Sequence, residues 1–150
     1  MTTATFTDWN DLIAESEYDA LAAIRDAVRV GNLEEAEAGI LEFMEIVAKK
    51  QRNAVRSHLK QLMAHVLKWK IQPNHRSRSW ATTIINSRDE IEDLQEESPS
   101  ITNEDIYREL WDDAFLRAKR LAAVDTGLKV TVSDLTWKEV FEDEYFLPDE

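Results

Sequence analysis

Residues 32–71 read NLEEAEAGILEFMEIVAKKQRNAVRSHLKQLMAHVLKWKI, a run without proline. Apolar side chains recur in it at the three- and four-residue spacing of one helical face. They are Leu33, Ala36, Ile40, Phe43, Met44 and Val47 in the first half and Val55, Leu59, Leu62, Val66 and Trp69 in the second. The pattern predicts either one bent helix or two helices, with a turn at the polar residues 49–53 in the second case.

Turn and cap residues delimit further helices on both sides of this run. Before it, Ser16 with Asp19 resembles a capping box, although that helix has an alternative start near Asp8 or Trp9, and Gly31 is suited to its end. Asn32 is then expected to cap the helix of residues 32–71.

After the run, Pro73 disfavours a helical residue before it and breaks the helix. Ser77 or Ser79 is expected to cap the next helix, which ends at Ser98-Pro99. Thr102 with Asp105 forms another capping box, and the helix that it opens ends at Gly127. A short helix over residues 136–141 follows in the tail. The sequence therefore predicts an all-α fold, an antiparallel helical bundle of about five helices with a short C-terminal tail.

The composition limits the class of protein. With 150 residues the chain fits one domain, residues 1–150, with a hydrophobic core. Three glycines, at Gly31, Gly39 and Gly127, cannot build a phosphate-binding loop of the P-loop or dinucleotide type. The absence of cysteine excludes disulfides, thiolate metal sites and cysteine nucleophiles, and it suits a reducing compartment. Because residues 1–6 lack a basic region and no apolar run approaches the ~20 residues of a membrane span, we expect a cytoplasmic protein without membrane contact.

Charge is segregated along the chain. Residues 46–88 contain ten Lys or Arg, all three histidines and no Asp or Glu, whereas the remainder carries 8 basic against 30 acidic residues. Three interpretations stay open. The basic segment binds nucleic acid or phosphate, it packs against acidic neighbours within its own bundle, or the acidic faces bind a basic partner protein.

The histidines do not form a metal site in the predicted helix. His58 and His65 are two turns apart, about 10.5 Å along the axis, so they cannot reach one ion at ~2 Å. We therefore expect no metal and no cofactor, and we interpret His65 as a hydrogen-bonded core histidine. Trp69 and Trp80 flank the break at Pro73. Together with Arg76 and Arg78 they form either a pocket for an anion or base, or a pair that fixes the turn.

The motifs His65-Val66-Leu67-Lys68-Trp69, Gln72-Pro73 and Arg76-Ser77-Arg78-Ser79-Trp80 resemble the signature of a bacterial, largely cyanobacterial family catalogued as domain of unknown function twenty-nine. Weaker similarity covers most of the chain, including Phe146-Leu147-Pro148. The resemblance implies an all-helical fold and carries no activity. Family members typically show Glu-Glu-Ile-Glu where this chain has Glu42-Phe43-Met44-Glu45. They also tend to carry glutamates where this chain has Gln51, Arg56 and Lys60, so its middle is unusually basic.

We expect a non-enzymatic module that binds another protein, because a dense signature coincides with a helix break and no catalytic set is recognisable. The expected binding residues are His65, Lys68, Trp69, Gln72, Pro73, Arg76, Arg78, Ser79 and Trp80. One alternative is nucleic-acid or phosphate binding through residues 46–88. Another is an enzyme that uses His65 with Lys68 or Arg76 on a phosphorylated substrate. Homo-oligomerisation through Phe43, Met44 and Val47 is compatible with all three.

Overall fold

The computed structural model describes residues 7–148, so the expectation about a leader in residues 1–6 falls outside the described chain. All regular elements in the described part are helical, which confirms the all-α bundle. The stretch 130–132, whose side chains alternate, forms no strand. In chain order the elements are α1 (Trp9–Glu15), α2 (Glu17–Arg29), α3 (Leu33–Ile71), η1 (Pro73–His75), α4 (Arg78–Glu97), α5 (Asn103–Asp105), η2 (Ile106–Leu110), α6 (Trp111–Thr126) and η3 (Lys138–Glu142).

The helix ends follow the local signals in the sequence. Ser16 accepts a hydrogen bond from the backbone N–H of Asp19 at 3.1 Å and so starts α2, while Asp8 caps a separate helix, α1. Ser77, rather than Ser79, caps α4, and Thr102 forms the full capping box with Asp105. Both predicted glycine stops adopt the left-handed conformation, with φ of 78° at Gly31 and 70° at Gly127.

The long apolar run forms one helix. α3 continues for 39 residues, and residues 49–53 lie inside it without a turn. Lys, Gln and Arg are good helix formers, so this polar run has no intrinsic reason to break the helix. The tail helix begins slightly later than predicted, as the π-helical turn η3, where Thr136 accepts from the backbone N–H of Glu139.

The chain divides into two compact units, residues 1–50 and 51–150, which we call the first and second units. Each unit contains part of α3 and has its own hydrophobic cluster. The single domain over residues 1–150 stays a prediction.

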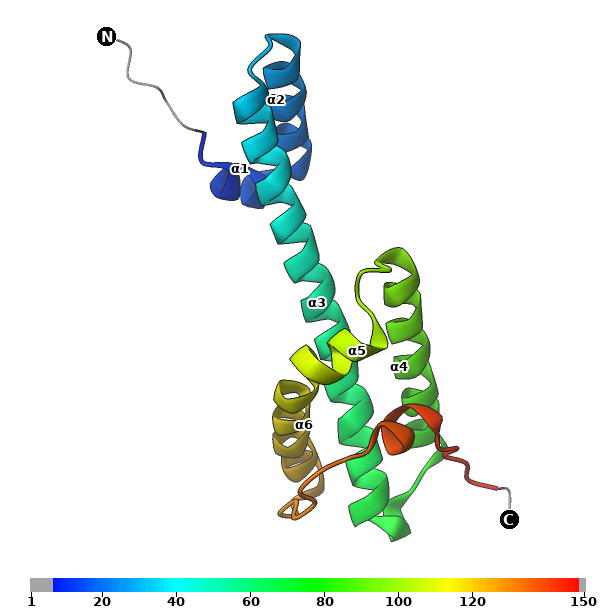
Figure 1. The fold of residues 1–150 in the computed structure, drawn as a ribbon. Helices are drawn as coiled ribbons and strands as arrows, with labels where there is room; N and C mark the ends of the chain where they lie inside the picture. Colours follow the sequence, from blue (N-terminus) through cyan, green and yellow to red (C-terminus); the bar gives the residue numbers. More distant parts are fainter. Residues whose placement is uncertain (1–6, 149–150) are drawn as a thin grey trace. The chain divides into compact units, whose positions relative to one another are not determined.

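In the first unit, α2 and the start of α3 form an antiparallel hairpin, and α1 packs beside it (Figure 1). Glu17 at the start of α2 pairs with Lys50 at 2.6 Å, while Ile24 meets Gly39. A Cβ atom at Gly39 would lie 2.7 Å from Ile24 Cγ1 and 2.9 Å from Trp9 Cζ2. Close packing of three helices therefore explains a mid-helix glycine, which costs about 1 kcal/mol relative to alanine.

In the second unit, α4 and α6 lie along the remaining part of α3, and the tail crosses beside them (Figure 1). α4 returns antiparallel to α3 after the break at η1. α6 runs in the same direction as α3, because α4 has already carried the chain back and α5 and η2 then lead it across to the start of α6 (Figure 1). Three ion pairs show this register: Arg52–Glu109 at 3.1 Å, Arg56–Asp113 at 3.5 Å and Lys68–Asp125 at 2.8 Å, all with the same offset of 57 residues.

Candidate functional site

The residues expected to bind a partner gather where α3 ends and α4 begins, and we call them the signature cluster. Lys68 and Trp69 are buried, and His65, Gln72, Arg76 and Trp80 are partly buried. The exposed members are Pro73, Arg78 and Ser79. The structure thus brings these residues together, with much of the cluster turned into the bundle.

Lys68 holds a charge inside the second unit. Its side chain is 10% exposed, and its ammonium lies 2.8 Å from the Asp125 carboxylate. The same ammonium lies 5.7 Å from the ring centroid of Trp80. Carboxylate and aromatic face together offset the loss of water around the ammonium. Lys68 therefore links α3, α4 and α6.

Trp69 and Arg76 fix the turn between α3 and α4. The Arg76 guanidinium carbon lies 5.0 Å from the Trp69 ring centroid, and its Nε donates to the Trp69 carbonyl at 2.8 Å. Trp69 also contacts Tyr145 of the tail edge-on, with centroids 5.6 Å apart. This arrangement favours the interpretation in which the tryptophans stabilise the turn over that of an open anion pocket.

His65 is a partly buried histidine bonded within its own helix. Its Nδ1 lies 2.8 Å from the Gln61 carbonyl oxygen. That oxygen can only accept, so Nδ1 carries the proton. Burial lowers the pKa of His65 from its ordinary value of 6.5, and the nearby Lys68 charge lowers it further, against the opposing effects of the Gln61 hydrogen bond and Asp125. The interpretation of His65 as a hydrogen-bonded histidine agrees with this geometry.

The lowered pKa of His65 predicts a loss of stability in mild acid. Below pH 6.5 the unfolded chain binds a proton at this ring, whereas the folded chain binds it only at lower pH. The free energy of unfolding should therefore fall as the pH falls from 6.5 through the folded pKa. Urea titrations between pH 7.5 and about 4.5 should show a smaller fall for His65→Gln than for the parent chain.

His75→Gln, at an exposed histidine of η1, is the matched control for this experiment. It should keep the pH dependence of the parent. An equal fall in the parent and in His65→Gln would contradict the assignment.

The tail is held by residues that sequence reasoning did not single out. Arg88 of α4 donates from Nε to the Val140 carbonyl at 2.8 Å, and its guanidinium carbon lies 5.6 Å from the Tyr145 ring centroid. Glu139 pairs with Lys70 of α3 and accepts from the backbone of Thr136. Tyr145 donates to the Glu139 carbonyl at 2.7 Å, and burial raises the pKa of Tyr145 to about 12. Only the Thr136/Glu139 spacing, a capping signal, is visible in the sequence.

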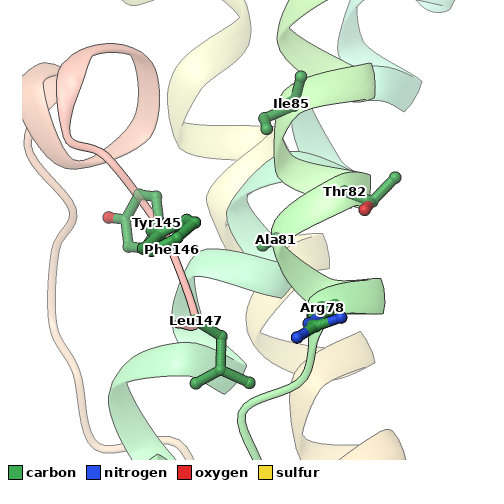
Figure 2. A pocket seen from close by; sticks show the side chains of 7 residues that line it. All are labelled: Arg78, Ala81, Thr82, Ile85, Tyr145, Phe146 and Leu147. Carbon is green, nitrogen blue, oxygen red and sulfur yellow. The ribbon is translucent and has the colours of Figure 1, made fainter. Parts of the chain in front are cut away.

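A cavity of about 280 Å³, the tail groove, opens between α4 and the docked tail (Figure 2). Arg78, Ala81, Thr82 and Ile85 share one face of α4 at helical spacing, and Tyr145, Phe146 and Leu147 face them. Figure 2 shows Arg78 and Leu147 at one end and Ile85 at the other. Since Ile85 and Phe146 are each more than half exposed, the groove is mainly an apolar surface with one cation at its end.

Most cations of the basic segment 46–88 interact with other groups of the same chain. Its cations form ion pairs with acidic residues of other elements: Lys50–Glu17, Arg52–Glu109, Arg56–Asp113, Lys68–Asp125 and Lys70–Glu139. Arg76 and Arg88 bond to backbone carbonyls. Of the three interpretations left open by the sequence, this pairing favours a basic helix packed on acidic neighbours.

An exposed apolar face lies on the first unit. On α2 it consists of Leu21 and Val28, seven residues apart, with Tyr18 beside them, and on α3 of Leu33, Ile40 and Met44. Each of these side chains is at least 45% exposed. For self-association the sequence suggested Phe43, Met44 and Val47. Of these three only Met44 belongs to the exposed face, because Phe43 and Val47 are partly buried.

Helical geometry places both rows of this face on one side of the hairpin. An α-helix turns by about 100° per residue. On α2 the exposed row is therefore rotated about 70° around the helix axis from the buried Ala20 and Ile24. On α3 the exposed row is rotated by a similar angle, in the same sense, from the buried Ala36. Equal rotations on antiparallel helices point to the same side. Gly39, where Trp9 of α1 packs, is rotated in the opposite sense from Ala36, so α1 covers the other side. We call the uncovered side, formed by Tyr18, Leu21, Val28, Leu33, Ile40 and Met44, the apolar face.

Within residues 7–148, no helix has the length and apolar character needed to cross a membrane. The same residues hold no group of three or more His, Asp or Glu arranged to bind a metal ion.

The family model described as "Domain of unknown function DUF29" matches residues 22–146. The match confirms the resemblance carried by the motifs of residues 65–80. No curated protein and no solved structure matches the chain.

Proposed function

We propose a non-enzymatic function for this chain, which belongs to the family described as a domain of unknown function, DUF29. The chain binds a basic amphipathic helix of another protein on its apolar face. The family description names no activity, so the proposal depends on the surface of this chain. The absence of cysteine suits the reducing cytoplasm, which is where we place this function.

One observation carries the proposal: six large apolar side chains are exposed together on one side of a helical hairpin. Single exposed apolar residues are common, but a contiguous apolar patch is typical of an interaction surface. An exposed apolar face on a helical hairpin accepts the apolar side of a third helix. Such a helix would present apolar residues at i, i+3, i+4 and i+7.

Charge determines which helix is suited to the apolar face. Residues 1–50 carry eleven Asp or Glu against four Lys or Arg. Glu34, Glu37 and Glu45 are exposed on α3, near the apolar face. A partner with lysine or arginine beside its apolar stripe would be attracted, whereas a second copy would bring two acidic units together. A basic partner is therefore favoured over self-association.

The signature cluster supports protein binding by a second route. Its exposed Arg78 lines the tail groove, where Ile85 and Phe146 leave an apolar surface. We retain this groove as part of the proposal, as a place for an apolar side chain of a partner protein.

A designed peptide tests the apolar face directly. The probe is an 18-residue helix, about five turns long, with leucines on one face and lysines on the other. Fluorescence anisotropy of the labelled peptide should show binding to the protein. A peptide with glutamate in place of lysine should bind at least about tenfold more weakly, since like charges then face each other.

The variant Met44→Ser should weaken binding of the lysine peptide at least about tenfold, because it removes a large exposed apolar side chain from the face. Leu116→Ser on α6 is the matched control, being 57% exposed against 61% for Met44, and it should bind like the parent. Equal binding of the two peptides, or no effect of Met44→Ser, would overturn the proposal. A concentration-dependent dimer that Met44→Ser abolishes would overturn it in favour of a second copy.

A further inference from the structure

The second unit contains a groove of about 370 Å³ between α3 and α6, lined by Lys60, Arg117, Arg120, Leu121 and Val124. We propose that this cationic groove binds a compact phosphate monoester with an apolar body. The site is separate from the apolar face and shares no residue with it.

The register of the two helices places like charges opposite each other in this groove. Three ion pairs each join a cation of α3 to a carboxylate of η2 or α6: Arg52–Glu109, Arg56–Asp113 and Lys68–Asp125. The same offset of 57 residues brings Lys60 opposite Arg117, and both residues line the groove. Facing like charges destabilise a helix pair unless an anion lies between them.

Most of this positive charge is not neutralised by the protein. Among residues 7–148, neither Lys60 nor Arg120 forms an ion pair. Arg117 pairs with Asp113 at 2.9 Å, but the same carboxylate also pairs with Arg56 at 3.5 Å. One carboxylate thus faces two guanidinium groups, and two further cations are left for a ligand.

The ends of the groove limit the size of the anion. The stretch of α6 between Asp113 and Asp125 contains no acidic residue, and the facing segment of α3 contains none either. Twelve residues of helix span about 18 Å. A long polyanion would extend past this stretch and meet the carboxylates at both ends, so a compact anion is favoured over nucleic acid.

The lining residues indicate the chemical class of the ligand. Guanidinium groups offer paired N–H donors that match the oxygens of a phosphate, and a lysine adds a point charge. Leu121 and Val124 form an apolar wall on the α6 side, and Val124 is 82% exposed. An ester with an apolar body would cover this wall while its phosphate meets the cations.

Phenyl phosphate, inorganic phosphate and phenol are suitable probes for calorimetric titration of the full chain. Phenyl phosphate should bind once per chain and more tightly than inorganic phosphate, and phenol should not bind. Failure of phenyl phosphate to bind at millimolar concentration, or equal binding of phenol, would overturn the proposal.

Lys60→Gln and Arg120→Gln should each weaken phenyl phosphate binding about tenfold or more, since a hydrogen bond to a charged group is lost. Lys129→Gln makes the same charge change at an exposed residue outside the groove and should leave binding unchanged. Equal weakening by Lys129→Gln would show a general effect of charge and overturn the site. Lys60→Gln should not lower the free energy of unfolding, because it removes a repulsion.

Vesicles that contain phosphatidic acid present the same phosphate monoester on a membrane. Co-sedimentation that Lys60→Gln abolishes would support a lipid headgroup as the source of the ester. Binding of phenyl phosphate without co-sedimentation would support a soluble ester. Met44→Ser should leave both results unchanged, so failure of this proposal is distinguishable from failure of the helix-binding proposal.

Discussion

Replacing Trp111 by alanine is expected to lower the free energy of unfolding of the second unit by about 3–5 kcal/mol. Trp111 is 4% exposed and lies at the centre of an aromatic cluster. Its ring stacks on Trp137 with centroids 5.5 Å apart, and it also contacts Tyr107 and Phe141. The substitution leaves a cavity and removes aromatic contacts worth roughly 0.5–1.5 kcal/mol each.

Urea unfolding followed by circular dichroism measures this loss. Trp111→Phe keeps part of the ring contact and should lose less stability, so it remains informative if the alanine variant does not fold. Tyr107→Ala, at a residue that is 57% exposed in the same cluster, is the control and should cost far less. A loss below about 1 kcal/mol for Trp111→Ala would contradict the central role of this ring.

Removing the carboxylate beside Lys68 should have the second large effect. Asp125→Asn leaves a buried ammonium without its counter-charge, 2.8 Å from where the carboxylate was. Breaking a buried ion pair in this way costs roughly 3–5 kcal/mol. Because Asp125 is 40% exposed and water reaches it, we expect about 2–3 kcal/mol here.

The double variant Lys68→Met with Asp125→Asn should recover most of this loss, because an apolar side chain of similar length replaces the buried charge. Asp113→Asn, which removes the more exposed pairs with Arg56 and Arg117, should cost no more than about 1 kcal/mol. Urea unfolding measures the free energy of unfolding of all three variants. If the double variant were as unstable as Asp125→Asn, the loss would not come from an uncompensated charge at Lys68.

The helix ends marked by caps were predictable from the sequence because their signals are local, whereas the division of residues 103–126 into α5, η2 and α6 was not predicted. Ser16, Thr102 and Gly127 act on backbone groups within four residues, so the neighbouring sequence contains all the information needed. The choice between one and two helices over residues 32–71 was not predictable. Its polar centre breaks no helix by itself, and the helical pattern is the same in both cases.

The arrangement of the helices depends on contacts between distant residues. The parallel register of α3 and α6 becomes visible only through pairs such as Arg56–Asp113. Arg88 holds the tail through the Val140 carbonyl, a backbone group that every residue type carries, so no side-chain pattern predicts it. The cationic groove likewise requires knowing that Lys60 faces Arg117. The sequence could show that residues 46–88 are basic but not which carboxylates face them.

The two separate hydrophobic clusters imply that the chain does not unfold in one step. Within residues 7–148, the cluster of the first unit has five buried residues, against nineteen in that of the second, so the local stability of the first unit should be lower. Between residues 44 and 54 of α3 no side chain is buried, and apart from Ile46 and surface ion pairs this stretch depends on its helical hydrogen bonds. Thermal denaturation should therefore pass through an intermediate in which the hairpin of the first unit has melted and α3 frays back to the second cluster. Amide protons at the two ends of this one helix would then exchange with solvent at very different rates.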